Sequence, residues 1–197
     1  MADVSSKHWF GPSTVTSKGK GHPLMFSFKE AEQFEDFPDG GGFPKGFLPR
    51  AYELLGVEDP NLVLHLCSGS MRVGVTVDIR PEMHPTVCCD ARHTPFEDVS
   101  FRWILIDPPY SAEYAENLYG TGSSYPSPGE LLREACRLLV PGGRVGLLHF
   151  QVPMFRHPLR LLGVYGITTG LGYAIRAFSV LIKDENLSRH HERGDDA

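Results

Sequence analysis

The fold is decided by the stretch WILIDPPY, residues 103–110. Its first half is an unbroken apolar run, which is typical of a short strand buried on both faces of a sheet. The Asp-Pro-Pro that follows ends the strand, because proline lacks the backbone N–H that a sheet ladder needs. Similar short apolar runs bounded by turn residues recur around it, at 62–66, 73–77, 86–89, 144–149, 164–168 and 175–182. The pattern predicts an α/β sheet that is covered on both faces.

Two segments carry the spacing of helices. Residues 47–55 place their apolar side chains on one helical face. Residues 128–139 follow Ser127 as N-cap, with proline at the first helical position and Glu130 at the third, which is the pattern of a capping box. This second helix is expected to end before a Pro-Gly-Gly turn at 141–143, which leads into the next strand.

Length and composition indicate one domain with an N-terminal extension and a C-terminal tail. The 197 residues suffice for a single sheet-based core. Residues 1–45 are rich in Gly, Pro, Ser and Lys and are interpreted as an N-terminal extension, with one short candidate strand at 24–28. The domain itself is expected at 46–184. Residues 185–197 are charged and His-rich without apolar anchors, so they are expected to form a disordered tail.

Charge and cysteine content narrow the class of protein. The net charge of −5 argues against a broad basic face that grips long duplex DNA, although a local basic groove around one base remains compatible with it. The four cysteines are typical of a reducing compartment rather than of a disulfide framework. Neither an apolar signal segment nor a membrane-spanning run is present, so we expect a soluble, cytoplasmic protein.

Cysteines and histidines also invite a zinc interpretation, through Cys67, Cys88, Cys89, His65 and His93. No pair of them shows the two-residue spacing of zinc ligands. The adjacent pair in the third strand run is expected to point to opposite faces of the sheet. We therefore expect core thiols and no metal site.

The residues after the central strand have a specific chemical capacity. Ligands bind at the carboxyl ends of strands in an open α/β sheet, which is where Asp107 lies. Its carboxylate and a proline carbonyl can both accept hydrogen bonds from one –NH2 group and so orient the nitrogen lone pair. Tyr110 can stack on the ring that bears the amine. The alternative is purely structural, namely a Pro-Pro turn in which the aspartate caps the strand end and the tyrosine is half-buried.

Several motifs in order resemble those of class I methyltransferases, specifically the amino-methyltransferases of adenine N6 or cytosine N4. The resemblance covers about residues 45–183 and is carried by 63–70, 77–78, 89–92, 94–96, 107–110 and 141–144. It implies a Rossmann-like, mostly parallel sheet with a C-terminal antiparallel hairpin, and S-adenosylmethionine as the cofactor. The motif order also fits the small ribosomal-RNA guanine methyltransferases.

The same resemblance assigns roles to individual residues. The acceptor amine would be held by the catalytic group Asp107, Pro108, Pro109 and Tyr110. The cofactor would be bound by His65, Cys67, Ser68, Gly69, Ser70, Asp78, Asp90, Ala91 and Phe96. Within that set the loop 67–70 would pass the methionine moiety, Asp78 would accept from the ribose hydroxyls, and Asp90 would bind the adenine amine.

The sequence departs from the family pattern at the first loop. His65 stands where the family usually has an acid, and Gly69 precedes Asp78 by only nine positions, whereas a glycine loop, helix and strand need about 20. The first crossover helix is therefore expected to be reduced or missing, and the second to be a loop at 81–85. Residues 43–55 are one candidate to fill this gap, by contributing a helix and by placing Lys45 beside the methionine carboxylate. The alternative for Lys45 is a solvated surface charge.

The acceptor is expected to be a nucleic-acid base, in DNA rather than RNA. No segment is long enough for a separate recognition domain, so a recognition partner protein or a homodimer is a further expectation. The Gly/Ser segment 119–125 is predicted to act as a lid, with a plain connector as the alternative. Residues 156–160 either contact phosphates or form the solvated face of a short helix. The alternative functions are a methyltransferase for a small molecule or protein side chain, and a binding module without catalysis.

Overall fold

The computed structural model describes residues 43–44, 46–120, 125–168 and 174–185. The N-terminal extension with its candidate strand at 24–28, Lys45, most of the predicted lid at 119–125 and nearly all of the tail lie outside this part of the chain. Within it, no helix is both long enough and apolar enough to cross a membrane.

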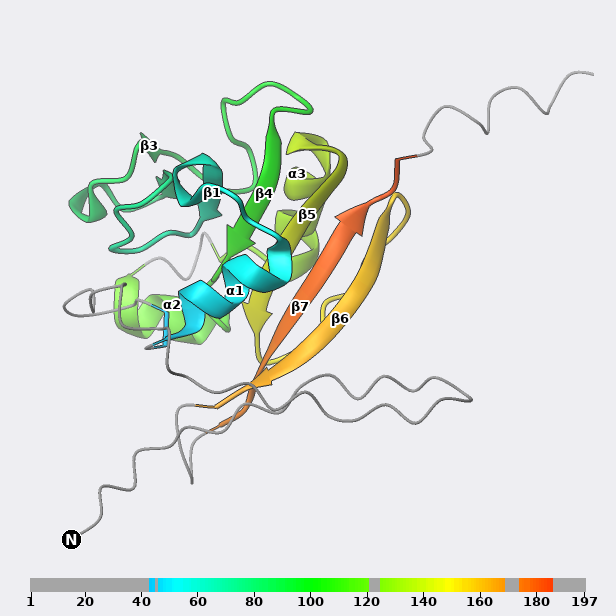
Figure 1. The fold of residues 1–197 in the computed structure, drawn as a ribbon. Helices are drawn as coiled ribbons and strands as arrows, with labels where there is room; N and C mark the ends of the chain where they lie inside the picture. Colours follow the sequence, from blue (N-terminus) through cyan, green and yellow to red (C-terminus); the bar gives the residue numbers. More distant parts are fainter. Residues whose placement is uncertain (1–42, 45, 121–124, 169–173, 186–197) are drawn as a thin grey trace, which may run out of the picture.

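A single sheet in the order β3-β2-β1-β4-β5-β7-β6 organises the molecule (Figure 1). Neighbours from β3 through β5 pair in parallel, whereas β7 runs antiparallel to both β5 and β6. The predicted mostly parallel sheet with an antiparallel C-terminal hairpin is therefore confirmed. The strands are β1 Val63–Leu66, β2 Val75–Asp78, β3 Val87–Cys88, β4 Phe101–Ile106, β5 Leu139–His149, β6 Leu159–Ile167 and β7 Arg176–Lys183.

Two strand boundaries differ from the prediction. The Pro-Gly-Gly segment at 141–143 was expected to be a turn before β5, but it lies inside this strand, which begins at Leu139. Gly143 permits this because a Cβ there would stand 2.8 Å from the Val140 carbonyl oxygen. β6 begins at Leu159 rather than at 164. The strand therefore includes Arg160, which pairs with Asp184, and the short helix considered for 156–160 is absent from these described residues.

Helices cover the two faces of the sheet, as Figure 1 shows for α1. The helix α1, Phe47–Leu55, has the predicted bounds and packs Phe47 against Phe178 of β7, with ring centroids 5.0 Å apart. The helix α3, Pro128–Leu138, buries its apolar face against the opposite side of β4 and β5. Its capping box is confirmed, since the Ser127 N–H donates to Glu130 Oε2 at 2.9 Å. The helix α2, Ala112–Tyr119, was not predicted because its sequence is poor in aliphatic residues.

The connections between the first three strands are unusually short. Residues 67–74, all of them described, join β1 to its parallel neighbour β2 without a helix, and residues 79–86 contain only the 3-10 turn η3, Pro81–Met83. Parallel strands ordinarily need a crossover of a dozen or more residues. The predicted loss of the first crossover helix is confirmed, and the second connection is close to the loop that was expected.

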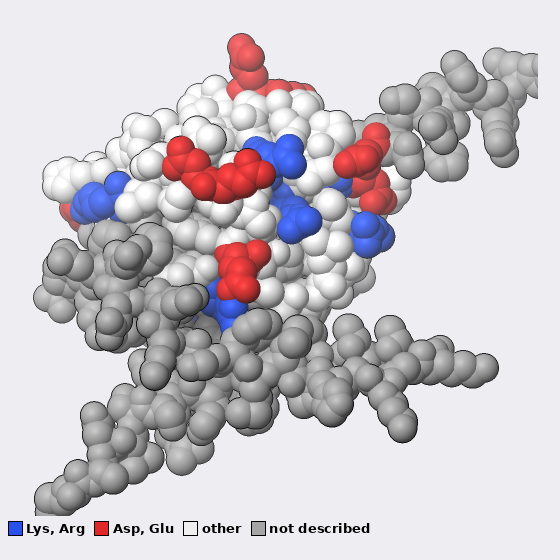
Figure 2. Space-filling model, viewed as in Figure 1, with Lys and Arg blue, Asp and Glu red and all other residues white. Residues whose placement is uncertain are grey.

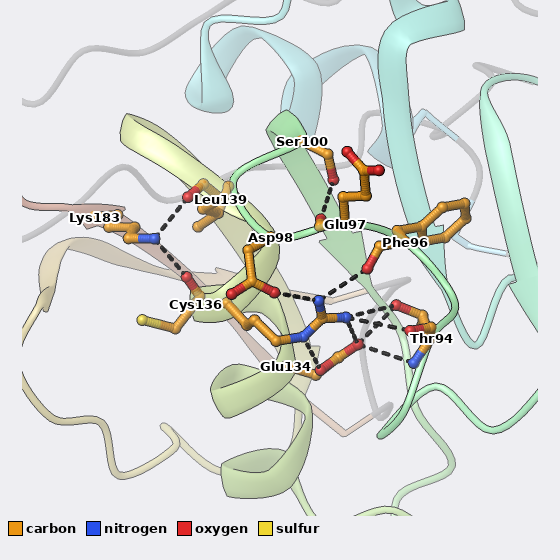
Figure 3. A network of polar contacts seen from close by, with 10 residues as sticks. Thr94, Phe96, Glu97, Asp98, Ser100, Glu134, Cys136, Leu139 and Lys183 are labelled. Carbon is orange, nitrogen blue, oxygen red and sulfur yellow. Dashed lines mark hydrogen bonds and ion pairs between the residues drawn. The ribbon is translucent and has the colours of Figure 1, made fainter.

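A buried polar network ties α3 to the loop that precedes β4 (Figure 3). Glu134 Oε1 accepts hydrogen bonds from the backbone N–H and the hydroxyl of Thr94, at 2.9 and 2.7 Å. Arg137 pairs with the same carboxylate and also donates to the Phe96 carbonyl oxygen at 2.8 Å. At the end of α3, the Lys183 ammonium group donates to the carbonyl of Cys136. This network positions the segment that carries Asp90 and Phe96.

The short crossover depends on Gly74, and this dependence can be tested. Gly74 has a φ of 79°, and a Cβ at this position would collide with the Val63 carbonyl oxygen and approach the Pro60 carbonyl oxygen to 3.0 Å. We expect Gly74→Ala to lower the free energy of unfolding by at least about 2 kcal/mol, because left-handed strain and a backbone collision add. Urea unfolding measures this loss.

The matched control is Gly129→Ala, which lies in α3 where a Cβ meets nothing within 4 Å. Alanine should be neutral there or stabilise the protein by about 0.4–1 kcal/mol. Equal stability of the Gly74→Ala variant and the unmodified protein would contradict the role of Gly74.

Candidate active site

Three motifs that are far apart in the sequence meet at the carboxyl edge of the parallel strands. The loop 67–70 follows β1, Asp78 ends β2, and Asp107 follows β4. The Asp107 N–H lies 3.4 Å from the Leu66 carbonyl oxygen, and the Gly69 N–H donates to Asp78 Oδ2 at 2.8 Å. The edge of the sheet therefore gathers the predicted acceptor residue and part of the predicted cofactor set.

The loop after β1 is tightly wound. Cys67 has a φ of 56°, a left-handed conformation that is uncommon for a residue other than glycine, and Gly69 has a φ of 54°. The Ser68 N–H donates to the Val77 carbonyl oxygen at 2.9 Å, which anchors the loop to β2. The Ser68 hydroxyl is buried and has no hydrogen-bond partner among the described residues. Buried hydroxyls are ordinarily bonded, so this atom fits a ligand that passes along the loop.

Charges converge on this loop. Burial raises the pKa of the Cys67 thiol well above its ordinary value, and the carboxylates of Asp78, Asp107 and Asp90 raise it further. Arg80 opposes these three acids. The thiol is therefore protonated and unreactive, and its surroundings are predominantly anionic. An anionic edge favours a cationic ligand such as a sulfonium ion.

Asp78 is already engaged by protein groups. Its carboxylate accepts from the Gly69 N–H, from the Arg80 N–H at 3.0 Å, from Arg80 Nε at 3.0 Å and from Arg80 Nη2 at 3.3 Å. A carboxylate offers about four lone-pair positions, so its accepting capacity is filled. If ribose hydroxyls bind Asp78 as predicted, they have to displace one of these donors.

A similar pairing of an acid with the arginine two residues later occurs after β3. Asp90 Oδ1 accepts from the Arg92 backbone N–H at 2.9 Å, and the Arg92 side chain donates to both carboxylate oxygens. The side-chain hydrogen bond from Arg92 holds the pKa of Asp90 below its ordinary value. Arg92 Nη1 also lies 3.9 Å from Glu130 of α3. Both acids of the predicted cofactor set are thus paired with an arginine two residues later.

The pKa of Asp107 is raised, whereas that of Asp90 is lowered. Burial raises its pKa to about 7, against the opposing influence of Arg176 and of the Tyr110 hydroxyl at 3.4 Å. A carboxyl group with this pKa is partly protonated at neutral pH and can both accept and release a proton. Perturbed carboxyls of this kind are concentrated at functional sites.

Contacts with three neighbouring side chains fix the Tyr110 ring beside Asp107. Arg176 Nη1 donates to its hydroxyl at 2.6 Å, and the guanidinium carbon lies 5.9 Å from the ring centroid. The ring of Phe150 is 4.4 Å away between centroids, and His149 meets Tyr110 edge-on at 5.7 Å. Phe150 is 48% exposed, so its ring leaves an open aromatic surface next to the acceptor residue.

Sequence reasoning missed these three neighbours of Tyr110. Phe150 directly follows β5, just as Asp107 follows β4, so an aromatic residue after a buried strand was an available signal. Arg176 begins β7, and only the antiparallel pairing of His149 with Ala177 brings it to the same edge. No local pattern marks that contact.

The remaining predicted site residues differ in where they lie. His65 is fully buried beneath α1, its Nε2 is 3.2 Å from the Tyr52 hydroxyl, and burial lowers its pKa to about 4. Ala91 is buried on the α3 side of the sheet, where Phe96 packs edge-on against Phe101 at 5.0 Å. Ser70 directly follows Gly69, and Pro108 and Pro109 directly follow Asp107, so these three residues lie at the edge. The cofactor roles of His65, Ser70, Ala91 and Phe96, and the acceptor roles of the two prolines, remain predictions.

The cysteines are free but do not all lie in the core. Cys88 is exposed, so its assignment as a core thiol is wrong; it lies in the edge strand β3, where its Sγ donates to the Ile79 carbonyl oxygen at 3.6 Å. Cys67, Cys89 and Cys136 are partly buried and pack against the core. In the described part of the chain, no three metal-ligating side chains form a group that could hold a metal ion.

Comparison with known proteins identifies the fold. No protein-family model matches the chain, and no curated protein matches its sequence. TrmN from Thermus thermophilus superposes with a TM-score of 0.50 and 21% identity over 70% of this chain and 48% of TrmN. The chain thus spans about half the length of TrmN. This likeness and the strand order show a Rossmann-like methyltransferase fold.

Two further solved structures have the same general likeness. An rRNA methylase from Streptococcus thermophilus has a TM-score of 0.47 and 9% identity over 70% of this chain and 96% of its own. The Burkholderia thailandensis 1,6-didemethyltoxoflavin-N1-methyltransferase, solved with S-adenosylhomocysteine bound, has a TM-score of 0.46 and 14% identity over 70% of this chain and 78% of its own.

The raised pKa of Asp107 has a consequence for stability. Between its ordinary pKa near 3.8 and its folded value of about 7, the folded state binds the proton more tightly than the unfolded chain does. The contribution of Asp107 to stability is therefore present at low pH and is lost as the pH rises through 7. We expect Asp107→Asn to be about 1–4 kcal/mol more stable relative to the unmodified protein at pH 8 than at pH 5.

Urea unfolding at the two pH values measures this difference. The control is Glu113→Gln on the exposed surface of α2, which leaves the buried carboxyl group in place. If the Asp107→Asn variant differs from the unmodified protein by the same free energy of unfolding at both pH values, burial does not raise the pKa of Asp107.

Proposed function

We propose that the protein is an S-adenosylmethionine-dependent methyltransferase that modifies an exocyclic amine of a nucleic-acid base, adenine N6 or cytosine N4, in DNA rather than RNA. The observation that carries this proposal is the buried carboxyl of Asp107 beside the Tyr110 ring, at the carboxyl end of the central strand β4. An acid and an aromatic ring in this geometry suit a planar acceptor that bears an –NH2 group.

The residues at the edge of the sheet fit the cofactor. Gly69 allows close approach because it lacks a Cβ, and the orphaned hydroxyl of Ser68 offers a hydrogen bond. Asp78 would accept hydrogen bonds from the ribose and Asp90 from the adenine amine, after Arg80 and Arg92 release these carboxylates. When bound, S-adenosylmethionine supplies a methyl group activated by a positively charged sulfur. The carboxylates around Cys67 favour that positive charge.

The acceptor side supplies orientation and a route for the proton. The amine would donate to Asp107 and to the Pro108 carbonyl, so that its lone pair points toward the methyl carbon. Tyr110, fixed by Arg176, would stack on the ring of the base. The nitrogen of the acceptor would have to lose a proton when it is methylated, and the Asp107 carboxylate would accept that proton. Positioning and exclusion of water supply most of the rate, and no covalent enzyme intermediate is needed.

A base in a duplex would have to leave the stack to reach this site. The exposed ring of Phe150, against Tyr110, extends the aromatic surface available to such a base. Base–aromatic stacking contributes about 1–3 kcal/mol per base in nucleic-acid-binding proteins. A partner protein or a second copy of the chain would then supply sequence recognition.

A second candidate acceptor is a small planar amine or a protein side chain. On the face seen in Figure 2, the acidic and basic side chains of the described residues are interspersed, and neither sign forms a continuous field. The net charge is also −5. Both observations favour an acceptor that needs no long phosphate-binding surface. Transfer of labelled methyl to free nucleosides but not to DNA or RNA would select this second candidate.

The role proposed for Asp107 predicts that its removal lowers methyl transfer without weakening cofactor binding. We expect Asp107→Ala to lower methyl transfer at least about 100-fold, the scale for removal of one oriented hydrogen-bonding group. The dissociation constant for S-adenosylmethionine should change little, because this carboxylate is assigned to the acceptor. Transfer of radiolabelled methyl to DNA, RNA and nucleosides measures the first quantity, and calorimetry measures the second.

Asp107→Asn is the conservative partner of this variant. It keeps one accepting oxygen, so it should retain more activity than Asp107→Ala. It should also lose the rise of activity with pH through about 7 that ionisation of the native carboxyl produces. If Asp107→Ala instead abolishes cofactor binding, Asp107 belongs to the cofactor site.

Cofactor binding itself is the first measurement to make. We expect S-adenosylmethionine and S-adenosylhomocysteine to bind at micromolar concentration in calorimetric titrations. Asp78→Ala should weaken both by about 1–3 kcal/mol, the scale of hydrogen bonds to a charged group. An absence of binding at millimolar cofactor would overturn the proposed function and favour a binding module without catalysis.

A further inference from the structure

The connection between β5 and β6 runs back along the sheet without a helix. Both strands are antiparallel to β7, which lies between them, so they point the same way (Figure 1). β5 ends at His149, level with Ala177 of β7. β6 begins at Leu159, level with Lys183, six residues further along β7. The crossover segment, residues 150–158, therefore travels about 20 Å along the strands and about 10 Å across them.

This crossover segment is extended and lies on the same face of the sheet as α3. Nine helical residues would span only about 14 Å, so a helix could not make the connection. Connections between parallel strands are nearly always right-handed, and α3 already joins β4 to β5 in the same direction along the sheet. On this face of β7, opposite to Phe178 and α1, Ser179 is fully buried. The crossover segment thus covers β7 in the place of a helix.

An extended segment turns alternate side chains toward the sheet and toward solvent. Pro153 is buried. Its neighbours in alternation, Phe150, Val152 and Met154, are 48%, 49% and 91% exposed, and Phe155 is 37% exposed. These four exposed side chains form what we call the apolar row. Contiguous apolar surface of this kind on a folded domain indicates a binding site.

Hydrogen bonds hold both ends of the crossover segment in place. The Gln151 N–H donates to His149 Nδ1 at 3.1 Å, where the segment leaves β5. The Leu159 N–H donates to the Arg156 carbonyl oxygen at 3.0 Å, where the segment enters β6. A ligand that binds a segment ordered in advance loses little conformational entropy. The apolar row is therefore presented in a form that is ready to bind.

The apolar row starts at the candidate active site and ends at a positive charge. The Phe150 ring contacts the Tyr110 ring, 4.4 Å between centroids. Arg156 follows the row and is exposed, and none of the described residues pairs with its guanidinium. No acid occurs in residues 150–158, although the net charge of the chain is −5. Apolar and aromatic side chains together with a cation suit a ligand that has both bases and phosphates.

A protein partner, including a second copy of the chain, suits the apolar row less well. A stable protein interface takes about 20–30 residues from each side. The row has four residues on one extended segment. A nucleic-acid strand needs only such a narrow track, because its bases contact exposed aromatic and apolar side chains one after another.

We infer that the crossover segment binds the unpaired nucleotides next to the acceptor base: the apolar row contacts their bases, and Arg156 pairs with a phosphate. This inference rests on the proposed function and deepens it. The substrate is then a single-stranded or locally opened nucleic acid rather than an intact duplex. Because the row begins beside Tyr110, nucleotides that bind along it bring the acceptor base to Asp107.

The test measures binding of the full chain to fluorescently labelled single-stranded DNA of mixed sequence, about ten nucleotides long, within the site sizes of such proteins. Fluorescence anisotropy gives the dissociation constant without cofactor. We expect the double variant Met154→Ala/Phe155→Ala to weaken binding about 5-fold to 100-fold, the range for loss of a stacked base. Arg156→Gln should make the slope of log affinity against log salt concentration shallower by about 0.7. The duplex of the same sequence should bind more weakly, because its bases are already stacked.

Leu62→Ala is the matched control. Leu62 is also apolar and 58% exposed, but it lies in the 3-10 turn η2, Pro60–Leu62, before β1. This substitution should change the affinity for the oligonucleotide less than about 2-fold, as surface substitutions away from a site do. Thermal unfolding of each variant verifies that the fold is intact.

Three results would overturn the inference. The first is that the unmodified protein does not bind the oligonucleotide, or binds the duplex equally well. The second is that the double variant binds as tightly as the unmodified protein. The third is that the double variant only dissociates a dimer in sedimentation velocity experiments, which would assign the apolar row to a second copy of the chain.

Failure of the proposed function gives a different pattern of results. If the protein binds no S-adenosylmethionine but loses oligonucleotide binding in the double variant, the methyltransferase proposal fails and the nucleic-acid contact stands. If it methylates free nucleosides but binds no oligonucleotide, the methyltransferase stands and this inference fails.

Discussion

The pairing of β1 with two parallel neighbours is the constraint on which the rest of the structure depends. Leu64 lies opposite Val75 of β2 on one side and Ile104 of β4 on the other. Because all three strands run the same way, their carboxyl ends meet at one edge. That edge gathers Asp78, the loop 67–70 and Asp107 without any direct link between them in the sequence. The chain achieves the first pairing with residues 67–74, a crossover that closes only because Gly74 has no side chain.

The short connections between β1, β2 and β3 change which groups are available to bind a charged ligand at the carboxyl edge of the sheet. A crossover helix ordinarily presents backbone N–H groups to an anionic ligand group, and here the first one is absent. In place of that helix, the edge has two acidic side chains, Asp78 and Asp90. Each of them pairs with the arginine two residues later. Backbone N–H groups are rigid, whereas guanidinium groups can exchange partners. In the proposed function, a ligand at this edge would therefore have to rearrange these two ion pairs.

Asp107, which we propose to hold the acceptor, is buried rather than paired with an arginine two residues later. Among the described residues no salt bridge reaches Asp107, and burial raises its pKa to about 7. Arg176 lowers that value but is itself committed to the Tyr110 hydroxyl at 2.6 Å. The result is a carboxyl group that can change protonation near neutral pH next to a rigid aromatic ring. Such a pair is suited to a neutral amine that must lose a proton after it reacts.

The sequence by itself determined the α/β class, the helix at 47–55, a helix predicted at 128–139 that ends at Leu138, the missing crossover helix and the position of Asp107 after a buried strand. These follow from apolar periodicity, capping residues and loop length, which are local properties of the chain. Only the tertiary structure decided that Arg176 and Phe150 surround Tyr110, because antiparallel pairing of β7 with β5 joins distant segments. It also decided that Arg80 occupies Asp78, because the choice among side-chain rotamers depends on burial and neighbouring charge, which no local pattern encodes.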